Sequence, residues 1–172
     1  GFLGLGVLGS DAAIKLKNIG FDVCGYSLSH KKIDGINCFY GNQMKEFLSK
    51  INVLVCTVPY TPKTHNLLSE KLFNKLKTPT YLINVARGKV QNEIDIIKAL
   101  DNGILTGAFL DVFEKEPLPE SSPLWNHEKI KITPHIASIT NAEAGAKQII
   151  ENYTRNKKNE KLINEINLQK GY

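Results

Sequence analysis

The sequence predicts an α/β protein in which a Rossmann-like, doubly wound parallel sheet binds a dinucleotide. Residues 4–9 read GLGVLG, a glycine motif that follows an apolar stretch and precedes a helical pattern of apolar residues. Further along the chain, strand-like apolar stretches alternate with helical ones, which is typical of a parallel sheet with helices on both faces. Several polar residues follow expected strands directly, and such sheets bind their ligands at the carboxyl ends of the strands.

The glycine motif is the expected binding site for the phosphates of the cofactor. Gly4 permits the tight turn, Gly6 lets the backbone approach a pyrophosphate, and Gly9 lets the helix pack closely on the strand. The first turn of the helix then presents backbone N–H groups and a partial positive charge. An ordinary glycine-rich turn is the alternative interpretation, which the flanking strand and helix disfavour.

The second expected strand, residues 21–26, indicates which dinucleotide binds. NAD-specific domains place an Asp or Glu at the end of this strand to hold the ribose 2′-hydroxyl. This chain has Ser27, Ser29 and Lys31 in that region, and Asp22 lies at the opposite end of the strand. A hydroxyl and cations in place of a carboxylate favour NADPH, with NADH as the alternative, unless the lysines merely begin a polar loop.

The remaining elements follow in order. Residues 44–48 are expected to form a short helix before a strand at 52–57, whose continuous apolar run suits burial on both faces. A helix from Ser69 through Leu76 and a strand at 81–85 come next. Asn92 is expected to cap the following helix, whose inward residues are Ile94, Ile96, Ile97 and Leu100. Strands at 104–110 and 130–132 precede a last helix, which opens with the capping box of Thr140 to Glu143.

Three functional side chains follow strands of this sheet. Arg87 comes after the strand at 81–85, Glu116 lies in the loop after 104–110, and His135 follows 130–132. A forked guanidinium binds carboxylate and keto oxygens, and an imidazole exchanges protons near neutral pH. A carboxylate against the second ring nitrogen orients the imidazole and favours its charged form. The set suits reduction of a 2-keto acid, although each residue alone could be a surface or loop residue.

Composition limits the other classes of function. The chain has 172 residues, a net charge of +5 and no apolar run long enough to span a bilayer. Its lysines are spread along the sequence, so we expect no nucleic-acid partner and no membrane association. Cys24, Cys38 and Cys56 lack the spacing of a metal site, so we predict no metal. Cys24 and Cys56 fall in apolar, strand-like segments, so we expect them to be buried, reduced thiols in the cytoplasm.

These motifs together resemble the D-isomer-specific 2-hydroxyacid dehydrogenases, and most of all the bacterial glyoxylate/hydroxypyruvate reductase A branch. Besides the glycine motif, the resemblance includes residues 84–88, 111–119, 122–125 and 133–137, and the ending at 170–172. It implies that Arg87 binds substrate, Glu116 supports the histidine and His135 performs acid–base catalysis. It also implies a homodimer and these cofactor contacts: Gly4, Gly6, Val7, Leu8, Gly9, Ser27, Ser29, Lys31, Thr57, Val58, Pro59, Thr64, Val85, Ala86, Arg87, Asp111, His135 and Ala137.

The family has a second, substrate-facing lobe built mainly from residues before the glycine motif, and we expect the chain to start within its first strand. We therefore expect a cofactor domain at residues 1–154, a tail at 155–172 that returns to the other lobe, and slow or no turnover by the chain alone. Alternatives are another D-2-hydroxyacid dehydrogenase acting on phosphoglycerate or D-lactate, a dinucleotide-sensing binding protein of the corepressor type, and an inactive fragment.

Overall fold

The structure is a computed structural model that describes residues 1–139 and 141–167. The chain divides into two compact units, Gly1–His135 and Ile136–Tyr172. The division lies before the last helix, whereas the sequence suggested a boundary at 154/155, which falls inside that helix. Thr140 of the expected capping box and the ending at 170–172 lie outside the described residues.

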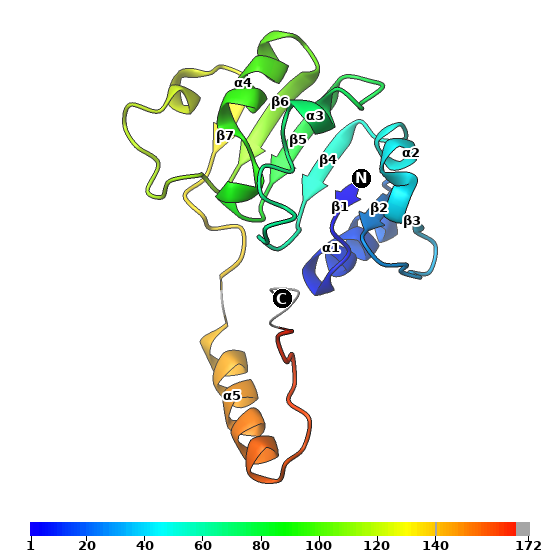
Figure 1. Ribbon diagram of the computed structural model, residues 1–172, viewed down its shortest axis with the longest axis vertical. Helices are drawn as coiled ribbons and strands as arrows, with labels where there is room; N and C mark the ends of the chain where they lie inside the picture. The colour runs from blue at the N-terminus through cyan, green and yellow to red at the C-terminus, as the bar shows by residue number, and fades with distance from the viewer. Residues whose placement is uncertain (140, 168–172) are drawn as a thin grey trace. The chain divides into compact units, whose positions relative to one another are not determined.

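The first unit is built on one parallel sheet (Figure 1). Its described strands run in the order β3-β2-β1-β4-β5-β6-β7. Their bounds are Phe2–Leu3 (β1), Cys24–Ser27 (β2), Asn37–Tyr40 (β3), Val53–Cys56 (β4), Thr80–Asn84 (β5), Leu105–Leu110 (β6) and Ile130–Ile132 (β7). The order reverses between β1 and β4, which is the topological switch point of a Rossmann-like sheet. The predicted fold class is therefore confirmed.

Helices cover both faces of this sheet. They are α1 (Val7–Asn18), α2 (Met44–Leu48), α3 (Glu70–Phe73) and α4 (Glu93–Asp101), with 3₁₀ helices η1 (Gly41–Gln43), η2 (Gly88–Val90) and η3 (Pro123–Asn126). Successive residues of β1 point to opposite faces and enter separate cores. Phe2 packs in a small core with Ala13 of α1, and Leu3 packs in a large core with Phe47 of α2 and Leu100 of α4.

Two strand predictions need correction. The edge strand β3 was not predicted, because its four residues alternate too briefly to stand out and its pairing with β2 comes from tertiary context. The second strand begins at Cys24 rather than at residue 21. Phe21 is exposed and its N–H donates to the carbonyl of Leu16, so this residue belongs to the end of α1.

The helix predictions have mixed outcomes. Asn92 caps α4 as predicted, since its Oδ1 accepts the N–H of Asp95 at 3.0 Å. Ile94 was predicted to face inward, which is wrong: its side chain is 65% exposed. Ser69 precedes α3 but makes no side-chain cap. The Asp95 carboxylate accepts the N–H of Glu70, the first residue of α3, at 3.0 Å, so a tertiary contact satisfies one N–H of the first turn.

The cysteines are free thiols. Cys56 is fully buried in β4, and burial raises the pKa of its thiol to about 12. Cys24 is only partly buried, so the prediction of a buried thiol holds fully for Cys56 alone.

The second unit contains helix α5, Ala142–Lys157. Asn141 caps it, with Oδ1 accepting the N–H of Ala144 at 3.0 Å. The segment after α5 folds back on it: Asn152 donates to the carbonyl of Ile163 at 3.1 Å and accepts its N–H at 2.8 Å. Within the described residues, no part of α5 is buried. This unit therefore coheres through polar contacts rather than through a core.

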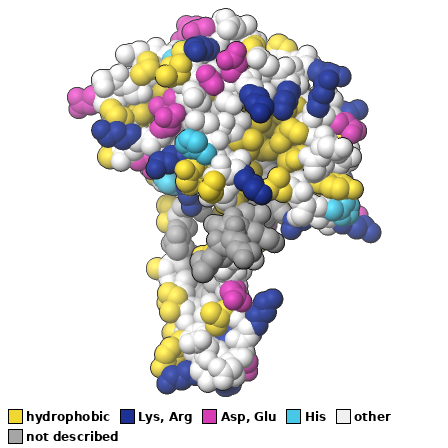
Figure 2. Space-filling model, viewed as in Figure 1, with side chains coloured by type: hydrophobic (Ala, Val, Ile, Leu, Met, Phe, Trp, Pro, Cys, Tyr) yellow, Lys and Arg dark blue, Asp and Glu magenta, His cyan; other side chains and the backbone are white. Residues whose placement is uncertain are grey.

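The charged side chains are interspersed on the face shown in Figure 2, where basic and acidic groups lie among exposed hydrophobic ones. In the described part of the chain, no helix is both long and apolar enough to cross a membrane. The same residues hold no cluster of three potential metal ligands.

Candidate active site

The glycine loop between β1 and α1 is shaped by two close contacts. Gly4 has a φ of +112°, which an L side chain rarely adopts. A Cβ on Gly9 would lie 2.1 Å from the carbonyl oxygen of Gly4 and 2.6 Å from Oγ1 of Thr57. A Cβ on Gly6 would meet nothing within 4 Å. The first and third glycines therefore shape the loop itself, while the second borders open space.

That open space lies at the N-terminus of α1, which suits an anionic ligand. Gly6 is the N-cap without a side-chain hydrogen bond, and the first turn of the helix contains no acidic residue. Val7 is 85% exposed. Thr57, at the end of β4, ties the loop in place by donating from Oγ1 to the carbonyl of Gly4 at 2.7 Å. Helix N–H groups and the helix dipole attract phosphate in this arrangement.

The residues that follow β2 lie at the carboxyl end of that strand, next to β1 in the sheet. Ser27 ends β2, and its hydroxyl donates to the carbonyl of Ser29 at 2.6 Å. Ser29 and Lys31 are exposed. Asp22 precedes β2 and so lies at its amino end, as the sequence suggested. The carboxyl end of β2 thus carries hydroxyl and ammonium groups where an acidic residue would repel a 2′-phosphate.

The turn after β4 contains the predicted residues Val58, Pro59 and Thr64. Val58 is half-buried and Pro59 is exposed. The Thr64 hydroxyl is buried and already engaged: it donates to the carbonyl of Pro59 at 2.7 Å and accepts the N–H of Thr61 at 2.7 Å. The structure therefore gives Thr64 a role in shaping the turn that presents Val58 and Pro59.

Arg87 follows β5 and projects from an exposed loop position. Its Nη1 donates to the carbonyl of Ala86 at 2.6 Å, the one hydrogen bond of the guanidinium to a described residue. Ala86 is itself buried, and its N–H donates to Oδ1 of Asn84 at 3.0 Å. A buried backbone thus supports an exposed cation.

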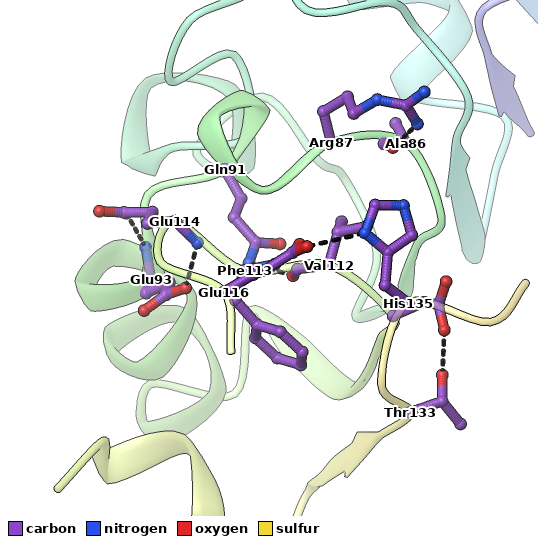
Figure 3. A network of polar contacts seen from close by, with 11 residues as sticks. Ala86, Arg87, Gln91, Glu93, Val112, Phe113, Glu114, Glu116, Thr133 and His135 are labelled. Atoms are coloured by element: carbon purple, nitrogen blue, oxygen red, sulfur yellow. Dashed lines mark hydrogen bonds and ion pairs between the residues drawn. The ribbon is translucent and has the colours of Figure 1, made fainter. Parts of the chain in front are cut away.

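Glu116 and His135 form a hydrogen-bonded pair across two loops (Figure 3). Oε2 of Glu116 lies 2.7 Å from Nδ1 of His135, and Oε1 accepts the N–H of Phe113 at 3.0 Å. Burial alone would raise the pKa of Glu116, but the hydrogen bonds from His135 and Phe113 outweigh it and lower the pKa. The carboxylate therefore stays ionised against the imidazole, and Nε2 is the ring nitrogen that lies outside this contact.

The backbone around His135 holds the imidazole in this position. His135 has a φ of +55°, in the left-handed region, and its N–H donates to the carbonyl of Thr133 at 3.1 Å. Thr133 donates from Oγ1 to Asp111 at 2.5 Å, and Asp111 is buried at the end of β6. A non-glycine residue in this conformation is uncommon and persists where surrounding structure holds it.

This geometry can be compared with known proteins. Residues 1–137 match the family described as D-isomer specific 2-hydroxyacid dehydrogenase, NAD binding domain. The chain belongs to this family. Its members are NAD(P)-dependent oxidoreductases, and the predicted resemblance is confirmed.

The relatives extend beyond the chain. Glyoxylate/hydroxypyruvate reductase A of Photorhabdus laumondii is 43% identical over 100% of this chain and 55% of the relative. The enzyme of that name from Serratia proteamaculans is 46% identical over 88% of the chain and 49% of the relative. The chain thus spans about half the length of these curated relatives.

Solved structures agree with the fold. A D-isomer specific 2-hydroxyacid dehydrogenase from Xanthobacter autotrophicus Py2, in complex with NADPH and MES, is 41% identical with a TM-score of 0.96, covering 99% of this chain and 71% of that one. An NADPH-dependent glyoxylate/hydroxypyruvate reductase from Sinorhizobium meliloti, in complex with NADP and sulfate, is 36% identical with a TM-score of 0.95, covering 99% and 56%.

In this 2-hydroxyacid dehydrogenase domain, the structure brings together Glu116 and His135 and places Arg87 on the loop after β5, near the same sheet edge. Val85 and Asp111 also lie directly after strands of that edge. Ala137 falls in the second unit. The sequence analysis missed the buried side chains of Asn84 and Gln91, although a polar residue at the end of an apolar strand is a signal that could have indicated Asn84.

Proposed function

We propose that this chain is the cofactor-binding and acid–base half of an NADPH-dependent reductase of small 2-keto acids, with glyoxylate and hydroxypyruvate as substrates and glycolate and glycerate as products. The hydrogen-bonded pair of Glu116 and His135, on the sheet edge that also carries Arg87, is the observation that carries the proposal. The names of the relatives support the choice of substrates. A homodimer in the cytoplasm is part of the same proposal.

The residues around the glycine loop fit NADPH. The open space at Gly6 and the acid-free N-terminus of α1 would take the pyrophosphate, and Ser29 and Lys31 would take the 2′-phosphate. Val58 and Pro59 would line the site beyond the loop. When bound, the cofactor supplies the hydride that reduces the keto carbon.

The chain's own residues do the rest of the chemistry. Arg87 binds the substrate carboxylate and polarises the keto oxygen through its forked N–H groups. His135 donates the proton on Nε2 to that oxygen as the hydride reaches the carbon, so the keto acid gains one hydride and one proton. Glu116 holds the ring through Nδ1 and stabilises its protonated form before the transfer.

The activity is tested on the full-length protein that contains this chain, by following NADPH absorbance with glyoxylate and with hydroxypyruvate. We expect turnover with both, and a loss of kcat of roughly 10²–10⁴-fold in His135→Asn with NADPH binding intact. Turnover of a phosphorylated or a lactate-type substrate alone would favour another dehydrogenase of the family. Binding of NADPH without any turnover would favour the dinucleotide-sensing interpretation and overturn the reductase.

The cofactor preference is tested by titrating the chain with NADPH and NADH while following nicotinamide fluorescence. Replacing both Lys31 and Lys32 with Ala should weaken NADPH binding by roughly tenfold or more, because charged hydrogen bonds to the 2′-phosphate are lost. Lys71→Ala, an exposed lysine of α3, is the control and should change nothing. Equal binding of the two cofactors by the unmodified chain would overturn the preference for NADPH.

A further inference from the structure

A buried amide links the two loops that carry the site (Figure 3). The side chain of Gln91, just after η2, is fully buried. Its Nε2 donates to the carbonyl of Val112 at 2.9 Å, and its Oε1 accepts from Nδ2 of Asn84 at 2.7 Å. One side chain thus connects the end of β5, the η2 turn and the loop after β6, which are distant in sequence.

The bonds of this amide lead directly to the functional groups. Asn84 accepts the N–H of Ala86, the residue before Arg87. Gln91 lies four residues after Arg87, so the arginine loop is held at both ends by the same pair of amides. On the other side, Val112 precedes Phe113, whose N–H donates to Glu116. A displacement of Gln91 would therefore reach both Arg87 and Glu116.

Two further contacts join the same loops. A Cβ on Gly88 would lie 1.7 Å from the carbonyl oxygen of Phe113. The backbone directly after Arg87 therefore packs against the backbone at the start of the loop that contains Glu116. Glu93 and Glu114 each accept the other's backbone N–H, at 2.8 and 3.0 Å. Gln91 lies between Gly88 and Glu93 in the sequence, and its hydrogen bonds are buried, whereas those of Glu93 and Glu114 are exposed.

We propose that Gln91 is a positioning residue, which fixes Arg87 relative to the Glu116–His135 pair so that substrate binding and proton transfer occur at one place. The inference rests on the proposed function. Both polar ends of the amide are required: an apolar side chain would leave the Val112 carbonyl and the Asn84 amide buried without partners, and an oxygen in place of Nε2 would face the carbonyl oxygen of Val112.

The test uses Gln91→Met and Gln91→Glu in the full-length protein. Met keeps the length of the side chain and removes both bonds, whereas Glu keeps the acceptor for Asn84 and removes the donor to Val112. Thr80→Val is the matched control: Thr80 is also fully buried, and Val removes its bond to the carbonyl of Thr78 at the amino end of the same strand, β5. Circular dichroism and melting first establish that each variant is folded.

Two measurements then separate positioning from general stability. With glyoxylate and NADPH we expect kcat/KM to fall by roughly tenfold to a hundredfold in the Gln91 variants, as for a misplacement of about 1 Å, and to stay within twofold in Thr80→Val. Carbon-13 NMR of the Glu116 carboxyl against pH should show its pKa moving up toward the usual range in the Gln91 variants only, because the Phe113 N–H shifts away from it.

Each outcome decides the matter. A folded Gln91 variant with unchanged kcat/KM and an unchanged Glu116 titration would overturn the proposal, and so would failure of both variants to fold, since Gln91 would then serve the core alone. A fall in kcat/KM shared equally by Thr80→Val would also overturn it. If the unmodified protein reduces no keto acid, the reductase proposal fails, while the Glu116 titration still decides whether Gln91 positions this loop.

Discussion

The two halves of the sheet edge differ in how far they are assembled. Beside β1 and β2, the residues expected to meet the cofactor are open: Val7 and Leu8 are exposed, and Gly6 borders empty space. Beside β5, β6 and β7, the functional groups are tied together by hydrogen bonds, from Asn84 and Gln91 to Glu116 and His135.

Under the proposed function, the difference reflects the task of each half. A site for pyrophosphate needs backbone N–H groups and room for close approach, which a glycine turn and a helix terminus provide without further support. A site for proton transfer needs donor and acceptor within a fraction of an ångström of their working geometry, so its side chains require supporting contacts. In the proposed function, the half with Glu116 and His135 carries such supporting contacts.

Gly88→Ala should have the largest effect, because Gly88 lies in the hydrogen-bonded half beside β5, β6 and β7. The new Cβ would overlap the Phe113 carbonyl oxygen, so one of the two loops must move. We expect a loss of about 3 kcal/mol in the free energy of unfolding and a fall of roughly a hundredfold in kcat/KM. Denaturant unfolding and steady-state kinetics of the full-length protein measure the two effects.

Gly145→Ala is the control for this substitution, since a Cβ at that position of α5 meets nothing within 4 Å. In a helix this change stabilises by about 0.5–1 kcal/mol. A Gly88→Ala protein as stable and active as the parent would show that the loops are not held by close packing. That result would contradict the difference in assembly between the two halves.

Gly6→Ala should affect the open half alone. Nothing in the chain opposes the new methyl group, so the free energy of unfolding should fall by no more than about 1 kcal/mol, the cost of Ala at the N-cap of α1. The methyl group would occupy the space where the pyrophosphate approaches, costing about 1–3 kcal/mol of binding, or roughly 5- to 150-fold in the Kd for NADPH. Unchanged affinity would mean that the phosphates bind elsewhere.

Among these substitutions, Glu116→Gln should have the smallest effect on stability, and it sharpens the comparison through the pH dependence of that stability. The pKa of Glu116 is lowered in the folded chain. Its contribution to stability is therefore present above the unfolded glutamate pKa of about 4.3 and is lost as the pH falls through the folded value. Chemical unfolding of the variant at pH values from 6 down to about 3 should show a flatter loss of stability than in the parent.

Glu93→Gln is the contrasting variant. Burial raises the pKa of Glu93, so in the parent its protonation favours the folded state as the pH falls through that raised value. Removing this carboxyl should make the free energy of unfolding fall more steeply with decreasing pH just above the ordinary glutamate pKa, which is the opposite of the effect of Glu116→Gln. Equal slopes for both variants would contradict the assignment of opposite shifts.

Local patterns predicted much of this fold. The glycine motif, the Asn92 cap and the continuous apolar run of β4 act within a few residues, so the sequence alone contains their causes. The placement of Arg87, Glu116 and His135 followed from one rule, that the carboxyl ends of parallel strands lie along one edge. The family resemblance implied that Glu116 supports His135, and Oε2 of Glu116 lies 2.7 Å from Nδ1 of His135.

The features that were missed depend on partners far along the chain. β3 pairs with β2, and the first N–H of α3 donates to the carboxylate of Asp95, 25 residues further along the chain. The Gln91–Val112 bond joins residues 21 positions apart, and no periodicity or spacing marks a glutamine as buried. Roles of this kind become visible only when two loops are seen side by side.

The left-handed backbone at His135 limits which amino acids this position tolerates. Asn is among the few non-glycine residues that adopt a φ near +55° readily, whereas a β-branched replacement would distort the turn as well as remove the imidazole. Random replacement of His135 would therefore mix two kinds of damage. Any library or directed-evolution experiment at this site starts from a short list of amino acids, set by the main chain before chemistry selects among them.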